Sequence, residues 1–64
     1  MRPKQTILVI DDELTLLKSV KERLELEGFN VLTSTTAEQA LATIARFPPD
    51  LMVVDLRLPG MSGL

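Results

Sequence analysis

Short runs of apolar residues separate longer amphipathic stretches along the 64-residue chain. Thr6–Ile10 and Leu51–Val54 are apolar or β-branched at every position, a composition typical of strands that are buried on both faces. Residues 29–33 alternate apolar and polar side chains, which predicts a shorter strand at an edge of a sheet. The pattern therefore predicts three strands, two of them in the interior of the fold.

Residues 13–27 change to a helical period. Leu17, Val20 and Leu24 recur at the spacing of one helix face, and charged residues occupy the opposite side. Leu16 lies beside this apolar stripe. Gly28 follows, at the position where a glycine commonly ends a helix. The pattern predicts a helix that packs its apolar face against the sheet.

A second helix is predicted to begin within residues 34–36. Thr35 and Glu38 match the capping box, in which each side chain accepts a hydrogen bond from the backbone N–H of the other residue. The helix ends before Pro48, because proline cannot continue a helix and restricts the residue before it. The apolar stripe expected to pack on the sheet comprises Ala37, Ala40, Leu41, Ile44 and Ala45.

The elements alternate in the order strand, helix, strand, helix, strand. This alternation predicts an α/β fold with a doubly wound parallel sheet, right-handed crossovers and helices on both faces. We expect the strand order 2-1-3, in which the first strand is central and its carboxyl end neighbours that of the third strand.

Composition excludes several classes of protein. The chain contains no cysteine and no histidine, so disulfides, Cys/His zinc sites and histidine-based catalysis are excluded. Its 7 basic and 9 acidic residues give a net charge of -2, which does not support direct nucleic-acid binding. The longest apolar run, residues 7–10, is far shorter than the roughly 20 residues of a membrane span. We expect a soluble, cytoplasmic protein that does not bind membranes.

Three aspartates follow the two fully apolar strands: Asp11 and Asp12 come after the first, and Asp55 after the third. Ligands bind doubly wound sheets at the carboxyl ends of strands, where the strand order reverses. Three carboxylates at one place repel one another unless a hard cation such as Mg²⁺ binds between them. An aspartate beside such a cation can attack phosphorus. In the alternative interpretation, Asp11 and Asp12 only cap the first helix and Asp55 is a turn residue.

The segments ILVIDDE and PDLMVVDLRLPGMSGL resemble the first half of a response-regulator receiver domain, a module of two-component signal transduction. The resemblance implies a flavodoxin-like fold in which residues 6–64 form the N-terminal half of the domain, after a lead-in at residues 1–5. The C-terminal half is absent from the sequence, together with the Ser/Thr and Lys that complete the family's site. Residues 55–61 are reminiscent of receivers attached to transcriptional activators or hybrid kinases.

The resemblance also implies roles for individual residues. Asp55 would accept a phosphoryl group from a sensor histidine kinase or a phosphotransfer protein, so the chain would be a phosphoacceptor and not an enzyme. Asp12 would ligate Mg²⁺ directly, Asp11 mainly through water, and Asp55 and the backbone carbonyl of Arg57 would complete the protein ligands. Glu13 is common at this place in the family, and we interpret it as a favourable charge at the start of a helix.

Other functions remain open at this point. Residues 11–15 nearly match the motif of haloacid-dehalogenase-type phosphatases, in which Asp11 would be the nucleophile, but that interpretation leaves residues 55–63 unexplained. Without the C-terminal half, the 64-residue chain is expected to be impaired or inactive as a phosphoacceptor. It could also be an inert half-domain that forms a homodimer through the exposed edge of its third strand.

Overall fold

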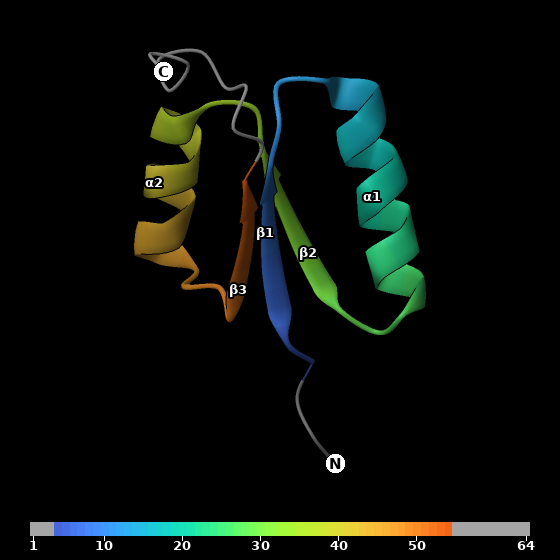
Figure 1. Ribbon diagram of the computed structural model, residues 1–64. Helices are drawn as coiled ribbons and strands as arrows, with labels where there is room; N and C mark the ends of the chain where they lie inside the picture. Colours follow the sequence, from blue (N-terminus) through green and yellow to red (C-terminus); the bar gives the residue numbers. More distant parts are fainter. Residues whose placement is uncertain (1–3, 55–64) are drawn as a thin grey trace.

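The computed structural model describes residues 4–54, which form a parallel three-stranded sheet with one helix on each face (Figure 1). The sheet order is β2-β1-β3. This arrangement confirms the predicted α/β class, the strand order and the helices on both faces. The elements are β1 (Thr6–Ile10), α1 (Leu14–Leu26), β2 (Asn30–Ser34), α2 (Ala37–Arg46) and β3 (Leu51–Val54).

The central strand β1 supplies both halves of the core because its side chains alternate between the two faces. Ile7 and Val9 pack with Leu17 of α1 and Val31 of β2. Leu8, which is fully buried, and Ile10 pack with Ala40 of α2 on the other face. A strand covered on both sides cannot carry polar residues, which explains why β1 is apolar or β-branched at every position.

Helix α1 begins one residue later and ends one residue earlier than predicted. Glu13 is its N-cap residue and makes no side-chain capping bond. Leu17 is buried, Val20 and Leu24 pack beside it as predicted, and Leu16 is exposed. Gly28 adopts φ +100°, a left-handed conformation that is strained for residues with a Cβ atom. The predicted role of Gly28 in ending the helix is therefore confirmed.

The N-terminus of α2 corrects one sequence prediction. Thr36, and not Thr35, is the N-cap, and its Oγ1 accepts the backbone N–H of Gln39 at 3.1 Å. The Gln39 side-chain oxygen in turn accepts the N–H and the hydroxyl of Thr35, at 3.0 and 2.8 Å. The predicted Thr35–Glu38 pair is wrong because the helix starts one residue later, which makes Gln39 the third helical residue and leaves Glu38 in the first turn.

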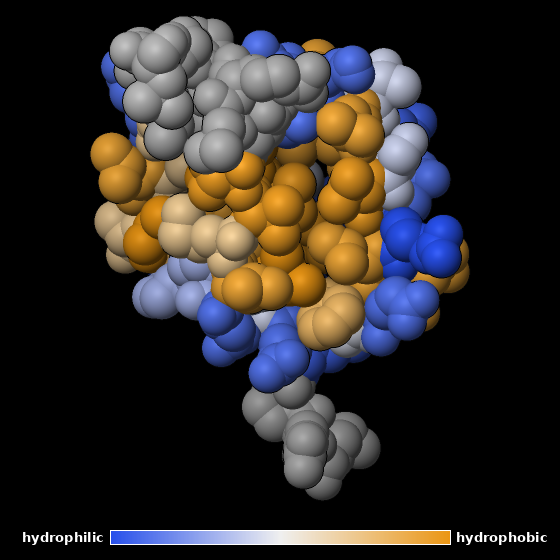
Figure 2. All heavy atoms as spheres, viewed as in Figure 1, coloured by the Kyte–Doolittle hydropathy of each residue, from blue (hydrophilic) through white to orange (hydrophobic). Residues whose placement is uncertain are grey.

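Strands β3 and β2 lie at the two edges of the described sheet. The edge position of β2 was predicted, although the strand begins and ends one residue later than predicted. Both helices pack over β1 and β2, and neither reaches β3 with its backbone. Leu51, Met52 and Val53 are therefore about half exposed, although their pattern is that of an interior strand. Leu41 of the predicted apolar stripe on α2 is also exposed (68%). Figure 2 shows apolar side chains gathered on this side of the molecule.

Candidate functional site

The backbone at the carboxyl end of β1 holds Asp11 in a fixed place. The Asp11 N–H donates to the carbonyl oxygen of Ser34 at 3.1 Å, so the hydrogen bonding between β1 and β2 continues one residue beyond β1. Asp11 is buried, with 6% of its surface exposed. A buried carboxylate requires compensating hydrogen bonds or a cation, because burial removes the water that would otherwise solvate it.

One oxygen of the Asp11 carboxylate has such a partner. Its Oδ1 accepts the backbone N–H of Glu13 at 3.0 Å, which closes a turn of the kind that aspartate side chains commonly form. This bond shapes the connection from β1 to α1. It does not cap the helix, because Glu13 is the N-cap residue and α1 has no side-chain capping bond. The second oxygen, Oδ2, accepts no hydrogen bond from residues 4–54.

Asp12 has a different environment. It is exposed, and its side chain forms no hydrogen bond with the part of the chain that the structure describes. Within the described residues, the Asp12 carboxylate therefore takes part in no structural interaction. The consecutive aspartates therefore combine a buried, oriented carboxylate with an exposed one beside it, an arrangement of oxygen donors that suits a hard cation such as Mg²⁺.

The parallel register brings the carboxyl ends of β1 and β3 to the same edge of the sheet. Ile10 pairs with Val54, the last residue of β3. Asp11 follows Ile10 in the sequence, and Asp55 follows Val54. Asp55 and Arg57 lie outside the described residues, so their predicted roles stay predictions. Within residues 4–54, no group of three Asp, Glu, His or Cys side chains could hold a metal ion.

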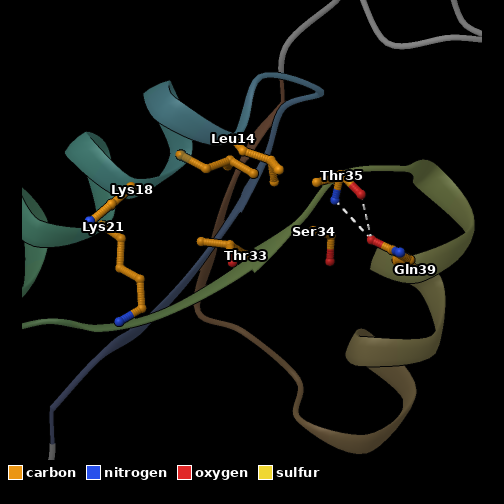
Figure 3. A pocket seen from close by; sticks show the side chains of 8 residues that line it. Leu14, Lys18, Lys21, Thr33, Ser34, Thr35 and Gln39 are labelled. Carbon is orange, nitrogen blue, oxygen red and sulfur yellow. Dashed lines mark hydrogen bonds between the residues drawn. The ribbon is translucent and has the colours of Figure 1, made fainter.

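Within the described residues, the lysines of α1 are not ion-pair partners of the carboxylates that follow β1. Lys18 and Lys21 line a cavity of about 450 Å³ between α1 and the end of β2 (Figure 3). The Lys21 ammonium group pairs with Glu25 at 2.9 Å on the same helix. Within the described chain, neither lysine forms an ion pair with Asp11 or Asp12.

Ser34 is a residue near the site that sequence patterns did not reveal. Its carbonyl oxygen holds the N–H of Asp11, while its buried hydroxyl has no hydrogen-bond partner within residues 4–54. Alternation along β2 places the Ser34 side chain on the same face as Leu32, which packs with α2. Ser34 also lines the cavity that Lys18 and Lys21 border (Figure 3). A serine at the end of a short strand has no distinctive pattern in the sequence.

Comparison with known proteins agrees with the fold. The family model of the response regulator receiver domain matches residues 7–64. The chain belongs to this family.

Transcriptional regulatory proteins are among its relatives. The protein is 43% identical over 58 residues to the transcriptional regulatory protein KdpE of Mycobacterium tuberculosis, covering 91% of this chain and 26% of KdpE. It is 44% identical over 59 residues to the probable transcriptional regulatory protein TcrX of the same species, covering 92% and 25% of the two chains. The DNA-binding response regulator MtrA of Mycobacterium leprae is 39% identical over 61 residues, covering 95% and 27%.

The chain thus spans about a quarter of the length of these curated relatives. No solved structure matches it significantly. Within the described residues, no helix is long and apolar enough to cross a membrane.

Proposed function

We propose that this chain carries the phosphoacceptor site of a response regulator, with Asp55 as the acceptor. The observation that carries the proposal is the register between β1 and β3. In this register the carboxyl end of β1, which the acidic pair follows, lies beside the carboxyl end of β3, which Asp55 follows. Family membership supports the same assignment. The chain acts in this proposal as a receiver of phosphoryl groups rather than as an enzyme with a separate substrate.

The chemistry of the transfer follows from the residue types. A carboxylate oxygen of Asp55 attacks the phosphorus of a phosphohistidine on a sensor kinase or phosphotransfer protein. The P–O bond forms as the P–N bond breaks, and the histidine leaves with the electron pair and takes up a proton. The product is an aspartyl phosphate. The partner supplies the histidine, and this chain contains none of its own.

The donor set fits Mg²⁺, because Asp11 and Asp12 offer carboxylate oxygens and Oδ2 of Asp11 is not engaged by the described residues. In the proposal Asp12 binds the ion directly, Asp11 binds it mainly through water, and Asp55 and the carbonyl of Arg57 complete the protein ligands. A bound Mg²⁺ would neutralise charge on the transferred phosphoryl group. The Glu13 N–H orients Asp11 for this task before any ion arrives.

The wider role is proposed from the relatives. Those named above are transcriptional regulators, and one is a DNA-binding response regulator. We propose that phosphorylation of this chain serves transcriptional control in the cytoplasm, where a kinase has access to ATP, and that DNA contacts belong to other segments. Another copy of the chain is a second proposed partner, because β3 has a free edge in the described sheet.

A phosphorylation assay tests the assignment of Asp55. The chain is incubated with acetyl phosphate and Mg²⁺, and the mass that phosphorylation adds to the protein is measured. Asp55→Asn should abolish the label, whereas Asp50→Asn, at the other end of β3, should keep it.

The same assay separates the phosphatase alternative. A label that persists in Asp55→Asn and disappears in Asp11→Asn would assign the nucleophile to Asp11 and overturn the proposal. Mg²⁺ binding is measured independently by calorimetry on the unphosphorylated protein. Asp12→Asn should weaken binding by about tenfold or more, as expected when a direct ligand loses its charge. Glu22→Gln, on exposed α1 surface, is the matched control and should leave Mg²⁺ affinity unchanged.

A further inference from the structure

The peptide group between Ser34 and Thr35 links two parts of the molecule. Its C=O accepts the backbone N–H of Asp11 at 3.1 Å. Its N–H donates to the side-chain oxygen Oε1 of Gln39 at 3.0 Å. The described chain has no cis peptide bond, and the C=O and N–H of a planar trans peptide group point in opposite directions. One rigid plane therefore connects the end of β1 to a side chain of α2.

Gln39 holds this plane by more than one hydrogen bond. Its Oε1 also accepts the hydroxyl of Thr35 at 2.8 Å, so a single oxygen binds both donors of that residue (Figure 3). The backbone N–H of Gln39 donates to Oγ1 of Thr36, the N-cap of α2, at 3.1 Å. The Gln39 side chain thereby fixes the connection between β2 and α2 relative to the helix.

On the other side of the plane, Asp11 depends on this connection for its place. Its N–H bond to Ser34 fixes the backbone from which the carboxylate extends. The bond from the Glu13 N–H to Oδ1, at 3.0 Å, then fixes the orientation of the side chain. A rotation of the Ser34–Thr35 peptide would displace the Asp11 backbone. A carboxylate that binds a metal loses affinity when the groups that orient it are removed.

We propose that Gln39 is a positioning residue for the Mg²⁺ site, because its side-chain oxygen orients the Ser34–Thr35 peptide that holds Asp11. This inference rests on the proposed function, in which Asp11 is one of the carboxylates that bind the ion. Gln39 itself does not contact the ion and acts through two hydrogen bonds and one peptide group. Hydrogen bonds in a chain polarise one another, so the bond to Gln39 also strengthens the bond to Asp11.

The surroundings of Gln39 allow its side chain to be changed without damage to the core. Gln39 is exposed and belongs to neither apolar cluster of the sheet. Its side chain borders the cavity of about 450 Å³ that Lys18 and Lys21 also line. Without Gln39, water can accept the Thr35 N–H. A water molecule is not attached to α2, however, so we expect a loss of orientation rather than unfolding.

Three substitutions separate positioning from general stability. Gln39→Leu removes the acceptor and keeps the net charge, and the two residues have similar helix propensities. Gln39→Glu retains an acceptor oxygen, and its charge is favourable in the first turn of a helix. Gly28→Ala is the matched control. It destabilises the chain near the other end of β2 through the positive φ of Gly28, and it leaves the net charge unchanged.

Amide hydrogen exchange of the metal-free protein, measured by NMR, gives the first readout. The N–H of Asp11 is compared with that of Asn30, which donates to Gln5 at 2.9 Å at the other end of the β1–β2 pair. Gln39→Leu should accelerate exchange of Asp11 relative to Asn30 by about threefold or more, as expected for the loss of a neutral hydrogen bond. Gln39→Glu should restore the original ratio. An unchanged ratio in Gln39→Leu, or no restoration by glutamate, would overturn the proposal.

Calorimetric titration with Mg²⁺ gives the second readout. Gln39→Leu should weaken binding by about threefold or more, less than the effect of removing a group bonded directly to a ligand side chain. Gly28→Ala should leave the affinity unchanged, and equal weakening by both would reduce Gln39 to a stabilising residue. If Asp12→Asn weakens binding but Gln39→Leu does not, the positioning role is refuted and the proposed function stands. Unchanged affinity in Asp12→Asn would refute the Mg²⁺ site itself, and this inference with it.

Discussion

Replacement of Leu8 by alanine tests the central position of β1. Leu8 is completely buried and packs with Ile10 and Ala40 on the α2 face. Leucine-to-alanine changes in cores cost about 2–5 kcal/mol, depending on how well the cavity can close. Leu32 and Ile44 in the same cluster are only partly buried and can move inward, so we expect the lower part of the range, about 2–3 kcal/mol.

This loss is large for a chain of this length. Stabilities of about 0.05–0.15 kcal/mol per residue imply about 3–10 kcal/mol for 64 residues, so Leu8→Ala would remove about a fifth or more of the free energy of unfolding. Leu26→Ala is the matched control. Leu26 is 84% exposed at the end of α1, and its replacement should change stability by less than about 0.5 kcal/mol.

Urea denaturation followed by far-ultraviolet circular dichroism measures the difference, because the chain has no tryptophan or tyrosine for fluorescence. With a slope of about 1 kcal/mol per molar urea, the midpoint of Leu8→Ala should fall by about 2–3 M. The proteins are compared at equal chain concentration, since association stabilises the folded state. Equal midpoints for Leu8→Ala and Leu26→Ala would show that β1 is not the buried centre of the sheet.

Three further substitutions probe local features by the same measurement. Thr36→Ala should cost about 1 kcal/mol because it removes the N-cap acceptor of the Gln39 N–H, and an unchanged midpoint would argue against this cap. Gly28→Ala should also cost about 1 kcal/mol. No atom would clash with the added Cβ, so the cost comes from the positive φ alone, and a stabilised variant would contradict that conformation. Ser34→Ala should be neutral or stabilising by up to about 1 kcal/mol, because it removes a buried hydroxyl that has no hydrogen-bond partner within residues 4–54. A loss above 1 kcal/mol would mean that this hydroxyl has a partner.

Much of the fold was predictable because local pattern and burial agree along this chain. The fully apolar β1 is the central strand, and the stripe of Leu17, Val20 and Leu24 packs on it as predicted. The two-sided placement of the helices followed from the alternation of elements and the fully apolar strands, whereas the strand order 2-1-3 was expected from the resemblance to receiver domains. The positions of Asp11 and Asp12 beyond β1 were also predictable, because aspartate ends an apolar run in the sequence itself.

Other features depended on exact boundaries or on distant neighbours. The capping pair formed at Thr36 and Gln39 because α2 starts one residue later than the sequence motif suggested. A one-residue shift of this kind is decided by how the whole helix packs, and both threonines have the side chain that a cap requires. The difference between the buried Asp11 and the exposed Asp12 is likewise tertiary, since it follows from the bond between Asp11 and Ser34.

The sequence by itself determined which segments are strands and helices, their order, and which strands end in aspartate, because these depend on periodicity and on residue type. The tertiary structure decided what each of these residues meets. It left β3 and Leu41 partly exposed despite an interior pattern. It also fixed one oxygen of Asp11 on the Glu13 N–H, while the other accepts no hydrogen bond from residues 4–54. The physical reason is that a residue's own hydrophobicity can be read locally, whereas its burial depends on neighbours that the chain brings from elsewhere.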